Sequence, residues 1–478
     1  MTVLNQNETQ NIKNKKVVIL GAGLAGLAAA WRLSQFAGHD IVILEKEAHT
    51  GGLAATLPFE GARFDLGSHR IHPGYPVESL EFIQNLLGNR LLTRPRDGTL
   101  IVNKWEIPYP LSPGSMLRAI GPADAARFAF SLAGAGLRNF FGRHLAEGEN
   151  YESYLSRKVG RLAYKTFHAP YARKVYGINP ENISSSAAST RVDSTAPFRF
   201  PGSGGRVKNF FHYPSDGFGA ITDTLLNEAR KRGARTVTGA SVDRLTARNG
   251  AIREISYIAS GAKHKIEADT IISTIPVNQL ASSITPGAPE NIANGAGALR
   301  WRGIRLLQLV IAKDKFLKGD TYYFPEEKYL FGRISEPKCF SPGMCPDDSS
   351  TTLNVEVILT PGDHLWNMDN KSFLALVVKD MEKVFTFRRS SIAKSRSIFL
   401  SDVYPVCDLR FRSNMEMVKG WLGSFGNLHS IGRGGMFFHG NADHSINLGL
   451  RTAENIASGG REGPTWGKED TQSFKVRV

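Results

Sequence analysis

Cysteine is scarce in this sequence, and the few cysteines show no pairing pattern. Only Cys339, Cys345 and Cys407 occur among the 478 residues. Their odd number and their spacing fit neither a disulfide framework nor a zinc site. We therefore expect free thiols, no bound metal and a cytoplasmic location.

Long apolar runs are also missing. The first sixteen residues are polar, and the apolar stretch 128–137 lies directly between Arg127 and Arg138. No segment reaches the roughly 18 apolar residues that a membrane-spanning helix needs. The sequence thus predicts neither a secretory signal nor a transmembrane helix.

Acidic residues are few relative to basic ones. The chain has 44 Asp and Glu against 59 Lys and Arg, and residues 90–210 alone hold 18 basic and 8 acidic residues. This excess is compatible with an anionic substrate, with peripheral contact to an anionic membrane, or with a solvated basic surface. No nucleic-acid-binding motif accompanies it, so nucleic acid is not expected as a partner.

The order of apolar runs predicts an α/β fold. Residues 16–20 and 41–45 are typical of buried strands, and the small residues of 23–36 between them indicate a helix. The pattern becomes largely helical from about 76 to 214. Strands are expected again at 236–275, with a hairpin turn at Asn249–Gly250 and a buried strand at 269–276, and at 300–313 and 351–359 in a separate sheet.

The motif GAGLAG at 21–26 predicts a dinucleotide site. Gly21 allows a tight turn after the strand, Gly23 lets a pyrophosphate approach the main chain, and Gly26 lets the helix pack closely on the sheet. The helix N-terminus then offers free N–H groups to the phosphates. Glu45, at the end of the second strand, is placed to accept hydrogen bonds from the adenosine ribose.

Two further glycine-rich segments favour FAD over NAD. GGL at 51–53 follows Glu45 closely and would let the main chain pass under an extended cofactor, and FDLGSHRIH follows at 64–72. Near the C-terminus, IGRGGMFFHGNADHS leads into a helix that begins near residue 443. The N-terminus of that helix would stabilise negative charge on a reduced flavin.

These motifs resemble one flavoprotein superfamily. The chain is similar to the FAD-dependent amine oxidase, protoporphyrinogen oxidase and phytoene desaturase superfamily, in the protoporphyrinogen oxidase-like branch related to UDP-galactopyranose mutase. The resemblance rests on GAGLAGLAAAWRL, GGLAAT, FDLGSHRIH, YARKVYGINPENISSSAASTRV, YPSDGFGAITDTL, GDHLWNMD and GRGGMFFHGNADHS. It covers nearly the whole chain.

The resemblance implies a Rossmann-like FAD-binding domain with an inserted α+β substrate domain. The FAD domain would comprise 1–75, 213–285 and 400–462, the substrate domain 76–212 and 286–399, and a loose tail 463–478. Beyond the residues named above, it implies cofactor contacts from Leu24, Ala25, Lys46, Gly51, Gly52, Leu53, Gly67, Ser68, His69, Val242, Gly432, Arg433, Asp443, His444 and Ser445.

The catalytic group is less clear than the cofactor. His69 and His72 lie in a loop expected beside the flavin, where imidazole can act as a base, although His69 could instead bond the cofactor or the main chain. Where the mutases carry a tyrosine and an aspartate near the sugar diphosphate, this chain has His439 and Asn441. His444 is expected to cap the last helix.

Several basic and aromatic residues are candidates for the substrate side. Arg70, Arg173, Lys174 and Arg191 could hold an anionic substrate or pair with carboxylates between the lobes. Tyr171, Tyr176 and Trp366 could stack on a ring or pack in the core. Three functions therefore stay open: an FAD-dependent oxidoreductase acting on a small molecule, a redox-neutral flavin isomerase or mutase, and a flavin-binding protein without turnover.

Overall fold

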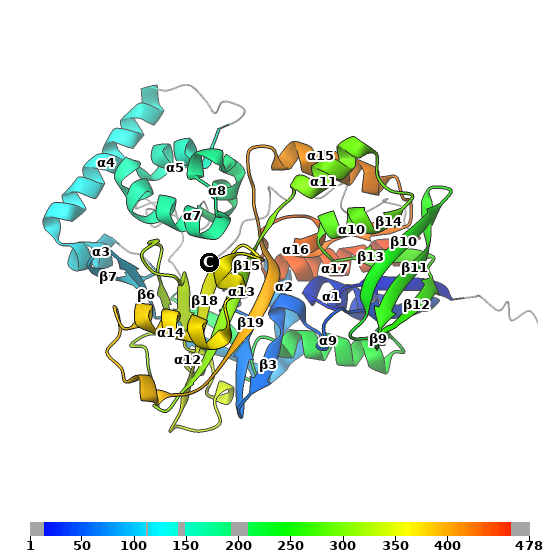
Figure 1. The fold of residues 1–478 in the computed structure, drawn as a ribbon, viewed down its shortest axis with the longest axis horizontal. Coiled ribbons are helices and arrows are strands. Elements are labelled where there is room, and N and C mark those ends of the chain that lie inside the picture. The colour runs from blue at the N-terminus through cyan, green and yellow to red at the C-terminus, as the bar shows by residue number, and fades with distance from the viewer. Residues whose placement is uncertain (1–13, 111–112, 142–148, 193–208, 460–478) are drawn as a thin grey trace, which may run out of the picture.

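The computed structural model describes residues 14–110, 113–141, 149–192 and 209–459. Figure 1 shows three parts: a sheet flanked by α1, α9 and α17, a second body of long strands including β15, β18 and β19, and a group of helices from α4 to α8 above that body. Arg191 belongs to α8, but its side chain lies outside the part of the chain that is described.

The first part is a five-stranded parallel sheet. Its strand order is β20-β13-β1-β2-β9, so segments from the beginning, the middle and the end of the chain lie side by side. The bounds are Lys15–Leu20 (β1), His39–Leu44 (β2), Arg235–Val237 (β9), Thr270–Ser273 (β13) and Leu428–Ser430 (β20). The strands predicted at 16–20, 41–45 and 269–276 are confirmed.

Small residues let the helices of this part pack closely. Helix α1 (Leu24–Leu33) lies against α17 (Ala442–Ala457), where a Cβ on Gly449 would be 2.4 Å from the carbonyl oxygen of Ala25. Helix α9 (Ala220–Lys231) also packs on α1. The predicted first helix and the predicted C-terminal helix are both confirmed.

A four-stranded sheet, β12-β11-β10-β14, lies beside the parallel sheet. Strands β10 (Ser241–Arg248) and β11 (Ala251–Ala259) pair antiparallel around the predicted turn, in which Asn249 and Gly250 have φ values of 53° and 70°. These positive φ values suit a two-residue hairpin turn. The remaining bounds are β12 (Ala262–Glu267) and β14 (Ile284–Thr285).

The second part is built on a seven-stranded sheet of order β19-β15-β18-β17-β16-β6-β7. Strands β15 (Trp301–Ile311) and β18 (Thr351–Leu359) confirm the separate sheet that the sequence predicts. The other members are β6 (Gly98–Val102), β7 (Trp105–Tyr109), β16 (Thr321–Tyr323), β17 (Arg333–Ser335) and β19 (Ile392–Pro405).

The segment 76–214 is less helical than predicted. Helices α2 (Val77–Leu87), α3 (Pro113–Ile120), α4 (Pro122–Phe141), α5 (Tyr151–Val159), α6 (Arg161–Ala163), α7 (Ala169–Tyr176) and α8 (Ser185–Val192) are present. Residues 91–109, however, form strands: β5 (Leu91–Pro95) pairs with β8 (Phe210–Pro214), and β6 and β7 form a hairpin that joins the seven-stranded sheet through β16. Tertiary pairing therefore decides the structure of this stretch.

Further elements complete the framework. They are β3 (Thr56–Phe59), β4 (Ala62–Asp65), α10 (Val277–Ser283), α11 (Glu290–Ala298), α12 (Pro337–Phe340), α13 (His364–Asn367), α14 (Asn370–Met381), α15 (Phe411–Gly423) and α16 (Gly432–Gly435). Short 3₁₀ turns include Gly52–Ala54, Pro180–Asn182 and Pro342–Met344.

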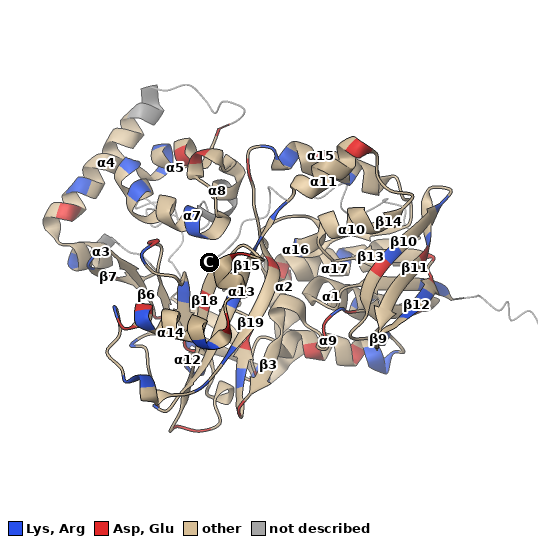
Figure 2. Ribbon diagram, viewed as in Figure 1, with Lys and Arg blue, Asp and Glu red and all other residues tan. Residues whose placement is uncertain are grey.

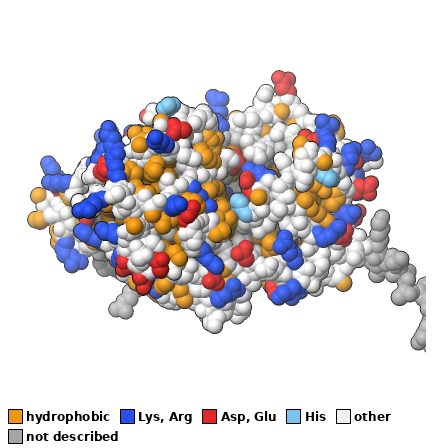
Figure 3. All heavy atoms as spheres, turned by 60° about the horizontal axis from the view of Figure 1, so that its bottom comes forward, with side chains coloured by type: hydrophobic (Ala, Val, Ile, Leu, Met, Phe, Trp, Pro, Cys, Tyr) orange, Lys and Arg blue, Asp and Glu red, His pale blue; other side chains and the backbone are white. Residues whose placement is uncertain are grey.

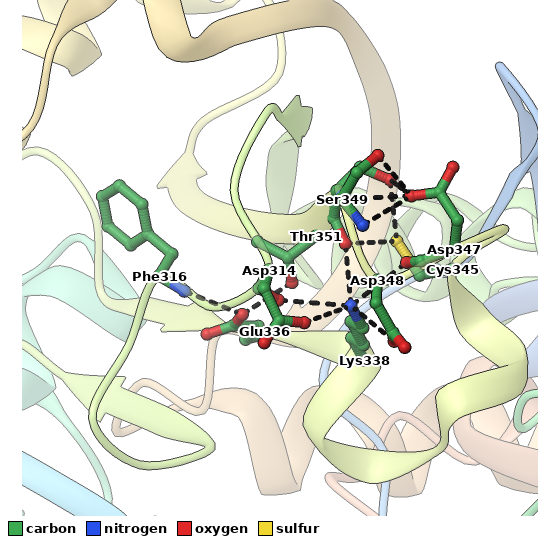
Figure 4. Close-up of polar contacts among 10 residues, drawn as sticks. Asp314, Phe316, Glu336, Lys338, Cys345, Asp347, Asp348, Ser349 and Thr351 are labelled. Carbon is green, nitrogen blue, oxygen red and sulfur yellow. Dashed lines mark hydrogen bonds and ion pairs between the residues drawn. The ribbon is translucent and has the colours of Figure 1, made fainter.

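A polar cluster closes the loop between β17 and β18 (Figure 4). Buried Glu336 accepts hydrogen bonds from the N–H groups of Phe316 and Leu317, at 3.0 and 2.7 Å. Lys338 pairs with Asp314 at 2.7 Å. These bonds tie the β17–β18 loop to the segment that follows β15, and so fix one end of the seven-stranded sheet.

Basic side chains are spread over the molecule. Lys and Arg occur on α3, α4, α5 and α7 in Figure 2 and also on other elements, and Figure 3 shows them across the whole face that it draws. In the described part of the chain, no helix is long and apolar enough to cross a membrane.

Candidate functional site

The fingerprint glycines have the geometry that their motif predicts. Gly21 has a φ of 98°, and a Cβ there would lie 2.3 Å from Thr274 Oγ1. A Cβ on Gly26 would lie 2.2 Å from the carbonyl oxygen of Gly21, so any side chain would push α1 off the sheet. At Gly23, by contrast, no atom lies within 4 Å of a Cβ position. The main chain is therefore open to a ligand at Gly23 and closed at the other two glycines.

The second glycine loop lies directly on the first. The N–H of Gly51 donates to the carbonyl oxygen of Ala22 at 2.8 Å, and a Cβ on Gly52 would be 3.1 Å from the Cα of Gly23. Gly51 and Gly52 have φ values of 102° and 54°, which favour glycine. Leu53 follows, partly buried. Two glycine loops thus share one edge of the sheet.

The third glycine loop reaches the same edge from the other end of the chain. The N–H of Ile431 donates to the carbonyl oxygen of Ser273 at 2.8 Å, which sets α16 beyond the ends of β13 and β20. A Cβ on Gly432 would lie 2.9 Å from the Cβ of Ala25. The first and last glycine turns are therefore adjacent, at the carboxyl ends of parallel strands, where open α/β sheets bind ligands.

Glu45 lies at the same edge with its carboxylate oriented by the main chain. It is 6% exposed and accepts hydrogen bonds from the N–H groups of Ala22, at 2.7 Å, and Glu47, at 2.9 Å. The neighbouring Lys46 is exposed, with its Nζ 3.8 Å from a Glu47 carboxylate oxygen. The N–H of Ala240 bonds the main chain of Glu45 at 2.8 Å, which brings the start of β10, with Val242, beside it.

The loop 67–69 carries polar atoms without partners. Gly67 has a φ of 135°, and the N–H of Ser68 donates to Glu356 Oε1 at 3.0 Å. Ser68 Oγ and His69 Nε2 are buried and have no hydrogen-bond partner among the described residues. Because buried polar atoms are normally hydrogen-bonded, such atoms are expected to face a ligand.

His69 is a neutral imidazole at pH 7. Burial, together with the nearby charges of Arg333 and Arg433, lowers the pKa of His69 to about 4. Its ring lies 4.9 Å from that of Phe218, between centroids. A neutral imidazole can accept a proton or a hydrogen bond, so this position suits either of the roles expected for His69.

The C-terminal loop ends in a capped helix. The N–H of Asn441 donates to His444 Nδ1 at 3.0 Å, and the Asn441 side chain accepts from the main chain of His444, which forms a capping box. His444 therefore caps α17, as expected from the sequence. Asp443 is fully buried in the first turn and Ser445 is half-buried beside it. Asn441, expected at the substrate, here orders the helix start.

The three catalytic candidates are placed differently. His72 Nδ1 accepts the N–H of Gly74 at 3.0 Å within its own turn. His439 stacks on Tyr404 with ring centroids 5.3 Å apart and planes 2° apart, and Arg433 lies over the same tyrosine at 5.8 Å. His69 is the candidate beside loop 51–53, because its imidazole interacts with the main chain of that loop.

The basic candidates are mostly paired within the protein. Arg70 bonds Asp320 at 2.6 Å, and its guanidinium lies over the rings of Phe211 and Phe340. Arg173 is 3.5 Å from Glu327 on the surface. Lys174 Nζ donates to three carbonyl oxygens, those of Phe324, Glu326 and Phe331 at 2.6 to 3.0 Å.

The aromatic candidates differ in how far they are buried. Tyr176 is buried in the core, and Trp366 packs on Phe399 with ring centroids 5.2 Å apart. Tyr171 and Trp366 both keep part of their surface exposed. Of the three, therefore, Tyr176 is the one that is closed to a ligand.

Sequence reasoning missed an ion pair next to His69. Glu356, 2% exposed on β18, accepts two hydrogen bonds from Arg333 on β17, at 2.9 and 2.7 Å, in addition to the Ser68 N–H. A carboxylate inside the otherwise uncharged run TTLNVEVIL was the available signal, because buried charges are rare unless paired.

The comparisons with known proteins agree with this geometry. The family model described as flavin containing amine oxidoreductase matches residues 24–461. The chain belongs to this family, and its cofactor is FAD. The fit is visible in the chain itself, because Gly23 is open, three glycine loops meet, and Ser68 Oγ and His69 Nε2 lack partners among the described residues.

Individual relatives are distant. The zeta-carotene-forming phytoene desaturase of Myxococcus xanthus is 24% identical over 284 residues, 54% of this chain and 53% of that protein, so the match spans about half of its length. The structure of a reduced UDP-galactopyranose mutase aligns with a TM-score of 0.76 at 19% identity, over 93% of this chain and 96% of that one. A putative protoporphyrinogen oxidase from Exiguobacterium sp. 255-15 aligns at 0.70 and 16%, over 93% and 99%. These structures share the fold.

Proposed function

We propose that this protein is an FAD-dependent oxidoreductase of the oxidase or desaturase type, which transfers a hydride between a small-molecule substrate and flavin N5. The observation that carries the proposal is the meeting of three glycine loops with Glu45 and the loop 67–69 at one edge of the parallel sheet. The desaturase among the relatives and the oxidoreductase family favour redox chemistry over the other two functions.

Different residues of the chain would contact each part of the cofactor. Glu45 would accept hydrogen bonds from the adenosine ribose, and the main chain at Gly23 and Gly432 would approach the pyrophosphate. Ser68 and His69 would lie beside the isoalloxazine ring. The N-terminus of α17, ordered by the Asn441–His444 cap, would direct N–H groups at the pyrimidine edge.

Little more is required of the protein for the reaction itself. Bound flavin supplies the hydride acceptor, and the chain has to position the substrate and exclude water. His69, neutral because burial lowers its pKa to about 4, is the group we assign to accept a proton from the substrate. His72 and His439 would then order the surrounding loops.

Retention of FAD tests the cofactor part of the proposal. The purified protein should be yellow with the spectrum of FAD, and Glu45→Gln should lower FAD affinity by about tenfold or more, since it removes a charged acceptor. Glu47→Gln is the matched control, because Glu47 is exposed and two residues away. A protein that stays colourless after reconstitution with FAD contradicts the proposal.

Anaerobic spectroscopy tests the reaction type. Under the proposal, the substrate bleaches the oxidised flavin without any added reductant. A mutase would form product only after dithionite or NAD(P)H has reduced the flavin, and a flavin-binding protein without turnover would do neither. A metabolite screen that follows flavin absorbance identifies the substrate by the bleaching it causes. His69→Gln should slow bleaching while the variant still retains FAD.

A further inference from the structure

A second group of side chains lies beyond His69, on the side of the seven-stranded sheet. We define it as the arginine–tyrosine cluster, which consists of Arg70, Arg96, Arg333, Tyr109 and Tyr323. These residues come from the loop after β4, the β5–β6 turn, β17, β7 and β16, respectively. Arg70 donates to Tyr323 OH at 3.1 Å, and the rings of Tyr109 and Tyr323 are 5.0 Å apart.

The cluster has more positive than negative groups. Arg70 is paired with Asp320 at 2.6 Å and Arg333 with Glu356 at 2.7 Å. Arg96 has no carboxylate partner among the described residues. It is 6% exposed, and its Nε and Nη2 are buried without a hydrogen-bond partner there. Its guanidinium carbon lies 4.8 Å from the centroid of the Tyr109 ring.

A buried guanidinium in this state is costly. Arginine stays protonated at all ordinary pH values, so it cannot escape the cost of burial by losing its proton. Burial alone would raise the pKa of Tyr323, but Arg70, Arg96 and Arg333 together hold it below its ordinary value. The surroundings of Tyr323 are therefore strongly positive.

The cluster is partly exposed and is adjacent to His69. Tyr109, Tyr323 and Arg333 are only half-buried, and Tyr171 of α7 acts electrostatically on Tyr109 from the helical side. Arg333 also acts on His69, and Arg70 is the next residue along the chain from His69. A molecule that contacts the cluster could therefore extend to His69.

We propose that the arginine–tyrosine cluster binds one carboxylate or phosphoryl group of the substrate, with Arg96 as the residue that supplies the uncompensated charge and Tyr109 and Tyr323 as hydroxyl partners. The inference rests on the proposed function and deepens it, because it names an anionic substrate. Arg173, a candidate from the sequence, has no part in it, since it pairs with Glu327 on the surface.

The test is anion binding to the FAD-loaded protein at constant ionic strength. Inorganic phosphate, pyrophosphate and benzoate are titrated separately, which distinguishes phosphoryl from carboxylate ligands. Binding is followed by the flavin difference spectrum and, independently, by the rise in unfolding temperature. The variants are Arg96→Gln, Arg96→Lys and Tyr109→Phe. Arg127→Gln is the matched control, because it removes the same charge from an exposed position in the same basic segment.

We expect at least one probe to bind the wild-type protein and the Arg127→Gln variant equally. Arg96→Gln should bind it about 10- to 100-fold more weakly, because a hydrogen bond to a charged group is lost. Arg96→Lys, which keeps the charge and should fold, should fall between them, and Tyr109→Phe should show a smaller loss.

Equal binding by Arg96→Gln and wild type, or no response of the wild type to any probe, would overturn the proposal. The two proposals can fail separately. If the protein does not retain FAD, the proposed function fails, while the anion-dependent rise in unfolding temperature still tests the cluster. If FAD is retained and bleached by a substrate but no anion binds, only this inference fails.

Discussion

The edge of the parallel sheet and the arginine–tyrosine cluster meet at His69 but are built from different groups. The sheet edge is built mainly from main chain, with glycines of positive φ and the carboxylate of Glu45. The cluster is side chain: guanidinium and phenol groups from five separate elements. A cofactor with a fixed pyrophosphate can be held by a repeated backbone shape, whereas a substrate has to be distinguished by its own charges.

Removing Glu356, the partner of Arg333, should lower the free energy of unfolding more than any other change considered below. Glu356→Leu leaves Arg333 without its counter-charge and the Ser68 N–H without its acceptor, and we expect a loss of about 3–5 kcal/mol of unfolding free energy. Urea denaturation measures it. The matched control is Glu382→Leu, which breaks an equally bidentate but exposed pair with Arg389 and should change little. Equal losses would mean that burial of the pair is irrelevant.

Gly26→Ala should disturb the packing of α1 at the edge of the parallel sheet. Its Cβ would lie 2.2 Å from the carbonyl oxygen of Gly21, so α1 must shift. We expect a loss of about 1–3 kcal/mol and weaker FAD retention. Gly297→Ala is the control, because this glycine is also helical and no atom lies within 4 Å of its Cβ position. Unfolding curves and the flavin content of both variants decide the matter.

Acidification should destabilise the protein through three histidines. Burial lowers the pKa values of His69, His168 and His429 from 6.5 to about 4. Between these values the unfolded chain binds more protons, so stability falls as the pH falls, by up to about 1.4 kcal/mol per pH unit for each histidine. Urea denaturation at several pH values from 4 to 7 measures this slope.

Asp65 works in the opposite direction. Burial raises its pKa from 3.8 to about 6, so the folded chain binds more protons in that window and the contribution of Asp65 to stability declines as the pH rises.

The variant His69→Gln tests the contribution of His69. It should reduce the number of protons taken up on unfolding between pH 4 and 6.5 by about one. Unchanged proton uptake in that variant would show that His69 is protonated in the folded protein.

The cap of α17 should give the smallest effect. Asn441→Ala removes a capping side chain and should cost about 1 kcal/mol. It should also alter the flavin spectrum, because the start of α17 faces the proposed pyrimidine edge. Asp369→Ala removes the cap of α14, which packs on the seven-stranded sheet, and should leave the spectrum unchanged. Identical spectra for both variants would place the flavin away from α17.

The glycine loops at the sheet edge could be predicted from the sequence, and the arginine–tyrosine cluster could not. Local motifs such as GAGLAG and the Asn249–Gly250 turn need particular residues at fixed spacings, so they are visible in the chain. Arg96 and Tyr109 are brought together by the β6–β7 hairpin, and Tyr323 joins them through the pairing of β6 with β16, which joins segments that are far apart along the chain. The strands at 91–109 were missed for the same reason.

The ion pairs of the candidate arginines could not be predicted from the sequence either. Nothing in the sequence tells which guanidinium meets a carboxylate, because Asp320 is distant along the chain from Arg70, and Glu356 is close to Arg333 only through strand register. The charge of segment 90–210 was informative as a total, but it did not reveal that Arg96 is buried without a carboxylate among the described residues.

The attachment of Lys174 has a consequence for the movement of α7. Its ammonium group joins α7 to the β16–β17 connection through three carbonyl oxygens, and Arg302 bonds the carbonyl oxygen of Lys174 at 3.3 Å. This end of α7 is therefore held to the strands, and α7 cannot move away from the sheet without breaking these hydrogen bonds.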